Sequence, residues 1–151
     1  MDNFLIEDDD IKIKKFEKSY FKYFKNFSPY DDILLTDYNL CFLTESEIKN
    51  WEKRIKSKKN NYFAIFFKDI LIGYISISRI SFLNSNFELS LCLDEKFCSK
   101  GYGFKSLRLF LEYYFENFDK YSIWLNVNAF NQRAIHLYEK IGFEKISEFL
   151  G

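Results

Sequence analysis

The chain has 151 residues, of which 22 are acidic and 22 are basic, so its formal net charge at pH 7 is zero. This length is typical of one domain, and we treat residues 1–151 as a single unit. A balanced charge argues against nucleic acid and membrane surfaces as partners, because proteins that bind them usually carry a basic excess. An acidic run at 7–10 and a basic run at 49–59 are interpreted as solvated surfaces.

Cysteine and histidine are too few and too irregularly spaced to form a metal site. Cys41, Cys92 and Cys98 stand at unrelated spacings, and the chain has one histidine. The pattern therefore predicts neither a zinc site nor a disulfide framework. No apolar run approaches the length of a membrane span, and the first residues lack an export signal, so we expect a cytoplasmic protein.

Hydrophobic periodicity predicts helices and strands that alternate along the chain. The first half comprises a strand at 11–14, a helix at 16–27, an irregular loop or short helix at 30–43, and a helix from Thr44 or Ser46 to Lys56. A hairpin of strands 62–67 and 71–77 follows, and then a strand at 87–93. The second half comprises a helix from about 102 to 118, a strand at 121–127, a helix at 131–141 closed by Gly142, and a strand at 143–149. This order indicates an α/β or α+β domain with a mixed sheet.

The strand at 87–93 alternates strictly between apolar residues and mostly polar ones. Its period of two separates two faces. One face carries Phe87, Leu89, Leu91 and Leu93, and the other carries Glu88, Ser90 and Cys92.

Two of the five glycines, Gly101 and Gly103, stand almost side by side just after this strand. They open a predicted helix, so consecutive backbone N–H groups would lie at a helix N-terminus, where phosphate binds through those groups and the helix dipole. Glycine removes the Cβ atoms that would keep a phosphate away, and Lys100 adds a mobile cation. The spacing matches neither the dinucleotide-binding fingerprint nor a Walker loop, and a simple turn is the alternative interpretation.

The predicted helix at 131–141 places Asn131, Ala134 and Tyr138 on one face, at positions i, i+3 and i+7. A small residue between an amide and a phenol leaves room for a ligand across that face. The alternative interpretation is a helix face that only packs into the core.

Together these segments resemble the GCN5-related N-acetyltransferase (GNAT) superfamily. The family's cofactor loop has the pattern Arg/Gln-x-x-Gly-x-Gly/Ala, and residues 98–103 match it except at the first position. The second signature, Asn-x-x-Ala-x-x-Leu-Tyr-x-Lys-x-Gly-Phe, is matched by Asn131, Ala134, Leu137, Tyr138, Lys140, Gly142 and Phe143. The resemblance extends in order over residues 11–149.

The resemblance implies a mixed, mostly antiparallel central sheet flanked by helices, in which two splayed strands, 87–93 and 122–127, form a cleft for acetyl-CoA. The pyrophosphate would lie on residues 99–104, the main chain of Leu91 and Leu93 would hold the pantetheine and polarise the thioester carbonyl, and Asn131 would bond the pantetheine arm. Tyr138 would protonate the departing CoA thiolate. The implied cofactor-binding residues are thus Leu91, Leu93, Cys98, Ser99, Lys100, Gly101, Tyr102, Gly103, Phe104 and Asn131.

The acceptor side of the implied site is less defined. An amine must lose a proton before it attacks, and Glu88 is the candidate base, acting through water; the alternative is a solvent-facing glutamate. Acidic and aromatic residues at 30–42 lie where the family's acceptor loops fall, and they suit a cationic amine. Cys98 replaces the family's Arg or Gln and removes a donor near the phosphates. The chain ends at Gly151, from which we expect a shortened acceptor pocket wall or one completed by a partner subunit, and the family implies a possible homodimer.

The resulting hypothesis is an acetyl-CoA-dependent N-acetyltransferase that acts on a primary amine by direct attack in a ternary complex, without a metal. The acceptor would be a small-molecule amine or a peptide N-terminus. The alternative is a catalytically weak acyl-CoA-binding sensor of the same fold. Acetylation of charged tRNA is a third hypothesis, and the zero net charge disfavours it.

Overall fold

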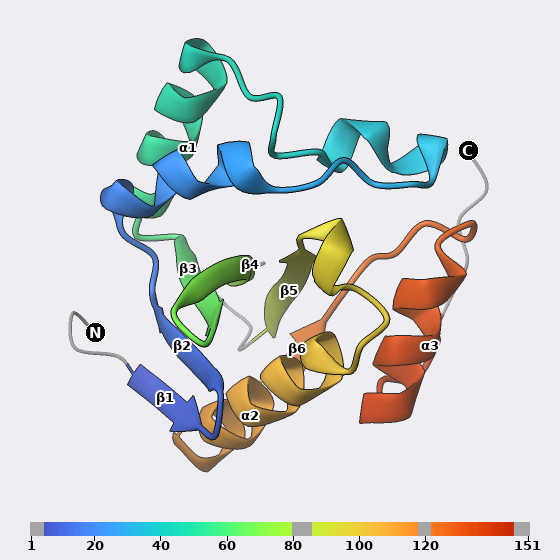
Figure 1. The fold of residues 1–151 in the computed structure, drawn as a ribbon. Helices are drawn as coiled ribbons and strands as arrows, with labels where there is room; N and C mark the ends of the chain where they lie inside the picture. Colours follow the sequence, from blue (N-terminus) through green and yellow to red (C-terminus); the bar gives the residue numbers. More distant parts are fainter. Residues whose placement is uncertain (1–4, 80–85, 118–121, 147–151) are drawn as a thin grey trace.

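The computed structural model describes residues 5–79, 86–117 and 122–146. Six strands form one sheet in chain order (Figure 1). They are β1 (Leu5–Asp8), β2 (Ile11–Lys15), β3 (Asn60–Phe67), β4 (Ile70–Arg79), β5 (Asn86–Leu93) and β6 (Ser122–Trp124). Neighbouring strands pair antiparallel from β1 to β5, whereas β5 and β6 are parallel. The predicted mixed, mostly antiparallel sheet is therefore confirmed.

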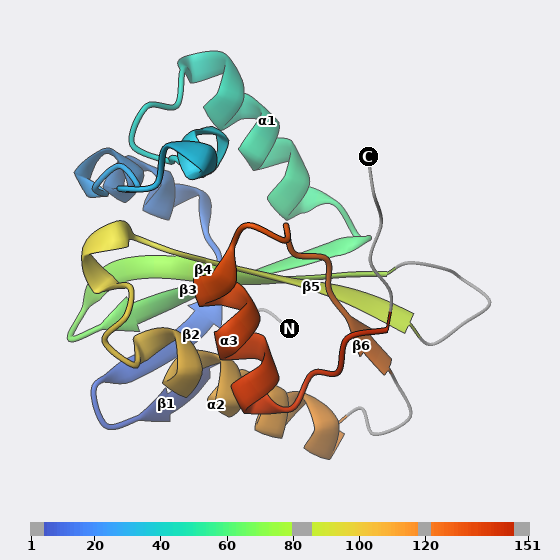
Figure 2. The same cartoon turned by 90° about the vertical axis from the view of Figure 1, so that its right-hand side faces the viewer.

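Helices cover both faces of the sheet (Figure 2). One face carries the 3₁₀ helices η1 (Lys18–Asn26) and η2 (Ile33–Tyr38) and the helix α1 (Glu45–Lys56). The other face carries α2 (Tyr102–Asn117) and α3 (Gln132–Ile141), and a short 3₁₀ turn, η3 (Glu95–Phe97), follows β5. The alternation of β5 divides its side chains between the two layers as predicted, because Leu89 and Leu93 join the core under α2 whereas Cys92 packs with the aromatic core under η1 and α1.

Local sequence signals explain where α1 and α3 begin and end. Thr44 accepts a hydrogen bond from the N–H of Glu47, and the Glu47 carboxylate accepts one from the Thr44 N–H, so Thr44 rather than Ser46 caps α1. Asn131 caps α3 by accepting from the N–H of Ala134 at 3.2 Å. Gly142 ends α3 at a φ of 125°, in the left-handed range that the sequence predicted for it.

Two predicted strands differ from the structure, and two other predicted segments are present in a form that the sequence did not specify. The acidic run at 7–10 contributes to β1 and its turn to β2, where Glu7 lies opposite Lys12, and Glu7, Asp9 and Asp10 are exposed as predicted. The helix predicted at 16–27 is present as a 3₁₀ helix over residues 18–26. The strand predicted at 121–127 ends at Trp124, and residues 143–146 form no strand; residues 147–149 lie outside the described part of the chain.

Candidate active site

The parallel pairing of β5 with β6 stops halfway along β5. The register joins Asn86, Phe87 and Glu88 to Ser122, Ile123 and Trp124, and β5 then continues to Leu93 without β6 beside it. The chain after β6 instead leaves the ladder and turns into α3 (Figure 2). The two strands that were predicted to splay therefore do so, after Glu88.

The free edge of β5 presents backbone groups of Leu91 and Leu93. The N–H of Asp94 donates to the Ile72 carbonyl at 2.7 Å. Every second residue before it, such as Cys92 and Ser90, therefore directs its N–H and C=O groups toward β4. Alternate residues point the opposite way, which directs the N–H and C=O of Leu91 and Leu93 into the space that β6 has left. These are the two residues from which the sequence predicted contacts with the pantetheine and the thioester carbonyl.

The glycine loop can accept a phosphate. Within the described residues, no acceptor is found for the backbone N–H groups of residues 99–104. Ser99 and Gly101 have φ values of 60° and 89° on either side of Lys100, and such turns gather N–H groups into anion-binding concavities. A Cβ at Gly101 would meet no described atom within 4 Å, so its surroundings are open. Unused donors at the N-terminus of α2 thus fit the pyrophosphate of a CoA cofactor.

Gly103 brings this loop against both β5 and α3. A Cβ at Gly103 would lie 3.1 Å from the Leu93 side chain and 3.3 Å from that of Leu137. A residue with a Cβ at this position would require the Leu93 and Leu137 side chains to shift by a few tenths of an ångström. The side chains on either side of Gly103 serve packing: Tyr102 lies 4.5 Å from the Phe67 ring, and Lys140 stands 4.6 Å over the ring of Phe104. Only the backbone of these two residues is available to a phosphate.

Tyr138, one residue after Leu137, lies close enough to Cys92 of β5 for the two side chains to interact electrostatically. Its side chain is buried with 9% exposed. Burial, together with the nearby Cys92, raises the pKa of Tyr138 to about 12. The phenol therefore keeps its proton at neutral pH beside the strand residue that lies between Leu91 and Leu93. The structure thus brings together the loop, the strand edge and the phenol.

Asn131 and Cys98 have structural roles that limit what they can offer a cofactor. The side-chain oxygen of Asn131 caps α3, which leaves its NH₂ group as the available donor. The N–H of Cys98 donates to the Glu95 carbonyl at 3.0 Å, and its thiol lies 3.5 Å from the Asp94 carbonyl. Burial raises the pKa of Cys98 to about 12, so the thiol stays protonated and packs inside the protein. Neither donor of Cys98 points to the phosphate loop.

Glu88 is exposed on the same face of β5 as Cys92. Four residues separate them, which is about 13 Å along the strand. The distance from Glu88 to a group held at Leu91 or Leu93 is too long for one hydrogen bond, so the base role predicted for Glu88 requires intervening water.

Three further residues at the end of β5 have roles that the sequence analysis did not predict. Asp94 has a side chain 1% exposed and accepts from the N–H of Ser28 at 2.8 Å. Lys96 neutralises it at 3.1 Å. Arg133 of α3 pairs with Glu95 at 2.9 Å and ties α3 to η3. An aspartate directly after an apolar strand was the one available signal, but the Ser28 N–H that it accepts from is distant in sequence.

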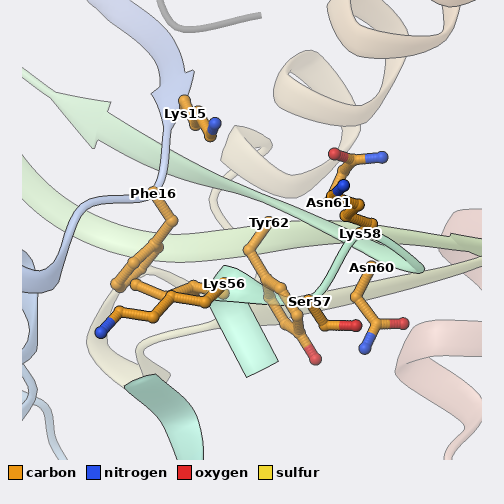
Figure 3. A pocket seen from close by; sticks show the side chains of 9 residues that line it. Lys15, Phe16, Lys56, Ser57, Lys58, Asn60, Asn61 and Tyr62 are labelled. Carbon is orange, nitrogen blue, oxygen red and sulfur yellow. The ribbon is translucent and has the colours of Figure 1, made fainter. Parts of the chain in front are cut away.

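A pocket lies elsewhere on the molecule and does not coincide with this site. Its volume is about 280 Å³, and it is lined by Lys15, Phe16, Ile55, Lys56, Ser57, Lys58, Asn60, Asn61 and Tyr62 (Figure 3). These residues come from the ends of β2 and α1 and the start of β3, and none belongs to the loop, β5 or α3. Among the described residues there is also no cluster of side chains suited to a metal ion, and no helix long and apolar enough to cross a bilayer.

Comparison with known proteins identifies the family. A family model described as an acetyltransferase (GNAT) domain matches residues 33–144, which is most of the chain. The chain therefore belongs to the GNAT acetyltransferase family, and the family predicted from its motifs is confirmed, together with the acetyl-CoA that this family uses.

Individual relatives are more distant. The spermidine N(1)-acetyltransferase of Escherichia coli (strain K12) is 23% identical over 100 residues, which cover 66% of this chain and 54% of that protein. The matched segment thus spans about half the length of this curated relative. A GNAT-family acetyltransferase from Bacillus anthracis has a TM-score of 0.76 at 21% identity, covering 95% of this chain and 86% of that one. Spermidine N-acetyltransferase from Vibrio cholerae, solved with CoA and spermine, has a TM-score of 0.74 at 20% identity, covering 91% and 83%. These structures confirm the fold.

Proposed function

We propose that this protein transfers the acetyl group of acetyl-CoA to a primary amine by direct attack in a ternary complex. The observation that carries the proposal is the meeting of three features at the free edge of β5: unused N–H groups at residues 99–104, the backbone of Leu91 and Leu93, and the protonated phenol of Tyr138. The sensor hypothesis shares the first two features, but it gives the phenol no role.

Each part of the site has one task in this proposal. Acetyl-CoA, when bound, supplies an acetyl group activated as a thioester. The N–H groups of residues 99–104 would hold its phosphates, and the NH₂ of Asn131 would donate to the pantetheine arm. The N–H of Leu91, aimed into the open edge, is placed to stabilise negative charge that develops on the carbonyl oxygen. Tyr138 would donate the proton of its phenolic oxygen to the sulfur that leaves, and the proton that the amine loses would pass through water to Glu88.

A polyamine is the acceptor that the observations favour among amines. Several curated relatives are spermidine acetyltransferases. The segment on the acceptor side of β5 carries exposed carboxylates at Asp31 and Asp37 next to the exposed aromatic rings of Tyr38 and Phe42. Carboxylates attract ammonium groups, and aromatic faces accept both cations and alkyl chains. The peptide N-terminus predicted as another acceptor remains the second candidate. The possible homodimer and the cytoplasmic location stay predictions.

A panel of amines tests the proposal. The full chain would be incubated with acetyl-CoA and, in turn, spermidine, a diamine, an amino acid and a peptide with a free N-terminus, while release of the CoA thiol is followed. We expect turnover to be fastest with the polyamine. Binding of CoA measured by calorimetry without turnover of any amine would instead identify a sensor, and absence of CoA binding would contradict both hypotheses.

A further inference from the structure

We propose that Tyr30 is an acceptor-binding residue whose phenolic oxygen receives a hydrogen bond from the amine substrate. This inference rests on the proposed function and concerns the side of β5 opposite to α3. Tyr30 lies between η1 and η2 and is not part of either of the family's two signature motifs.

Tyr30 closes the end of the free edge of β5. Its phenol donates to the Leu93 carbonyl at 2.6 Å, so one of the outward-facing carbonyls already has a partner. In contrast, no partner for the outward-facing N–H and C=O of Leu91 is found among the described residues. Leu91 and Leu93 are two residues apart, which is about 7 Å along the strand. Tyr30 therefore lies directly beside the stretch of edge where we expect the thioester.

Neighbouring hydrogen bonds hold Tyr30 in place. Its own N–H donates to the side-chain oxygen of Asn39 at 2.8 Å, and Ser28, two residues earlier, donates to the buried Asp94 at 2.8 Å. The segment between η1 and η2 accordingly passes over the turn that follows β5 (Figure 1). A residue whose backbone is held in this way, and whose phenol is bonded to the Leu93 carbonyl, loses little entropy when it contacts a ligand, which favours a binding role.

The phenolic oxygen of Tyr30 is able to accept a hydrogen bond. Its single proton is used by Leu93, so the thiol of Cys92, 3.1 Å away, must be the donor in the contact between them. Burial raises the pKa of Tyr30 above its usual value and that of Cys92 to about 11, so both groups remain neutral at pH 7. A thiol is a weak donor, and an ammonium is a strong one with no acceptor of its own. An amine that reaches this oxygen would form the stronger hydrogen bond.

Tyr30 and Tyr138 thus approach the same strand from opposite layers. Each phenol has Cys92 as a neighbour, Tyr138 from the α3 side and Tyr30 from the η1–η2 side. The acceptor side is further closed where Asn128, after β6, donates to the Tyr38 hydroxyl at 3.1 Å. The two phenols near Cys92 therefore have different roles: Tyr138 protonates the leaving sulfur, and Tyr30 orients the attacking nitrogen.

The variant Tyr30→Phe tests this assignment because it removes the oxygen and keeps the ring. Loss of a hydrogen bond to a charged partner predicts that the Kd and KM for the polyamine rise about 10- to 100-fold, while the Kd for CoA stays the same. Amine binding would be measured by calorimetry on the protein saturated with CoA, so that this readout does not require turnover. Tyr23→Phe is the matched control, since Tyr23 lies exposed on η1 and should leave both affinities unchanged.

The outcomes separate this inference from the proposed function. A wild-type chain that binds the polyamine without turnover would contradict the proposed function only. Turnover by the wild type together with an unchanged amine affinity in Tyr30→Phe would overturn the role of Tyr30 only. Equal losses of amine and CoA affinity in Tyr30→Phe, with a lowered melting temperature, would also overturn that role alone. If Tyr30→Phe does not fold, Asn39→Ala removes the acceptor of the Tyr30 N–H and retains the phenol. A selective rise in amine Kd would then support the role, and its absence would refute it.

Discussion

The two sides of β5 are held to the strand by different kinds of contact. On the α2–α3 side, Gly103 allows the two helices to approach the leucine side chains of β5 closely, and apolar packing predominates. On the η1–η2 side, an aromatic core lies under η1, and the segment between η1 and η2 is attached to the end of β5 by individual hydrogen bonds from Ser28 and Tyr30. The first side is the proposed cofactor side, and the second is the proposed acceptor side.

This difference shows how one fold can combine a constant cofactor with a variable acceptor. Helix packing is collective, so the N-terminus of α2 and the phenol on α3 have fixed positions relative to β5. Loops vary more among related proteins than the packed elements that they connect, so the segment between η1 and η2 can vary while those positions are kept. Substitutions on the two sides should therefore affect different measurements.

The largest effect is expected on the cofactor side, from Tyr138→Phe. Removal of a general acid predicts a fall in kcat of about 10²-fold or more, with the Kd for CoA unchanged. Because burial and Cys92 raise the pKa of Tyr138 to about 12, the wild-type phenol stays protonated at ordinary pH values. Its titration should therefore cause no loss of kcat between about pH 7 and about pH 10.

Single-turnover kinetics over this pH range would test the role of Tyr138. In the protein without ligands, the raised pKa also predicts that stability falls as the pH rises from about 10 toward 12, since only the unfolded phenol ionises there. An unchanged kcat in Tyr138→Phe would remove the assigned role. Tyr113→Phe on α2 provides a control on a tyrosine away from the edge of β5.

The next largest effect is expected on the acceptor side, from Asp94→Ala. The change leaves the Ser28 N–H without its buried acceptor and separates Lys96 from its partner, so the free energy of unfolding should fall by about 2–3 kcal/mol. Since Ser28 lies next to the segment that carries Tyr30, the KM for the amine should rise more than the Kd for CoA. Urea denaturation and steady-state kinetics would measure the two effects.

Asp69→Asn is the control for Asp94→Ala. Asp69 has a side chain 85% exposed and pairs only weakly with Lys12, so its loss should change stability by less than about 0.5 kcal/mol. A similar small change in Asp94→Ala would show that the acceptor side does not depend on this buried carboxylate.

The same difference between the two sides explains how far the sequence could predict the structure. The position of the glycine pair at the start of α2 and the Gly142 stop depend on contiguous residues, and these two features were predicted correctly. The strand before α3 was predicted too long because residues 125–127 continue the β-forming pattern of 122–124, whereas in the fold they leave the sheet.

The acceptor side depends on contacts between distant residues, and a single sequence does not reveal them. Sixty-six positions separate Ser28 from Asp94, and 63 separate Tyr30 from Leu93. The apolar spacing at 16–27 predicted a helix, and the structure forms one with 3₁₀ geometry, whose Phe21 and Phe24 rings pack against Trp51 of α1. That contact joins two segments that are distant in the sequence, so the spacing alone does not reveal it.

The smallest effect that we predict is on the cofactor side, from Gly101→Ala. Its φ of 89° disfavours any residue with a Cβ, and the methyl group would stand among the N–H groups that we expect to hold the pyrophosphate. We expect the Kd for CoA to rise about 10-fold, with little change in the KM for the amine. Gly142→Ala is a matched control, because Gly142 also has a positive φ of 125° and its Cβ would likewise meet no described atom within 4 Å. Both variants should lose about 1–2 kcal/mol of stability through backbone strain. If both also lost CoA affinity equally, strain alone would explain the result, and the loop would have no specific part in holding phosphate.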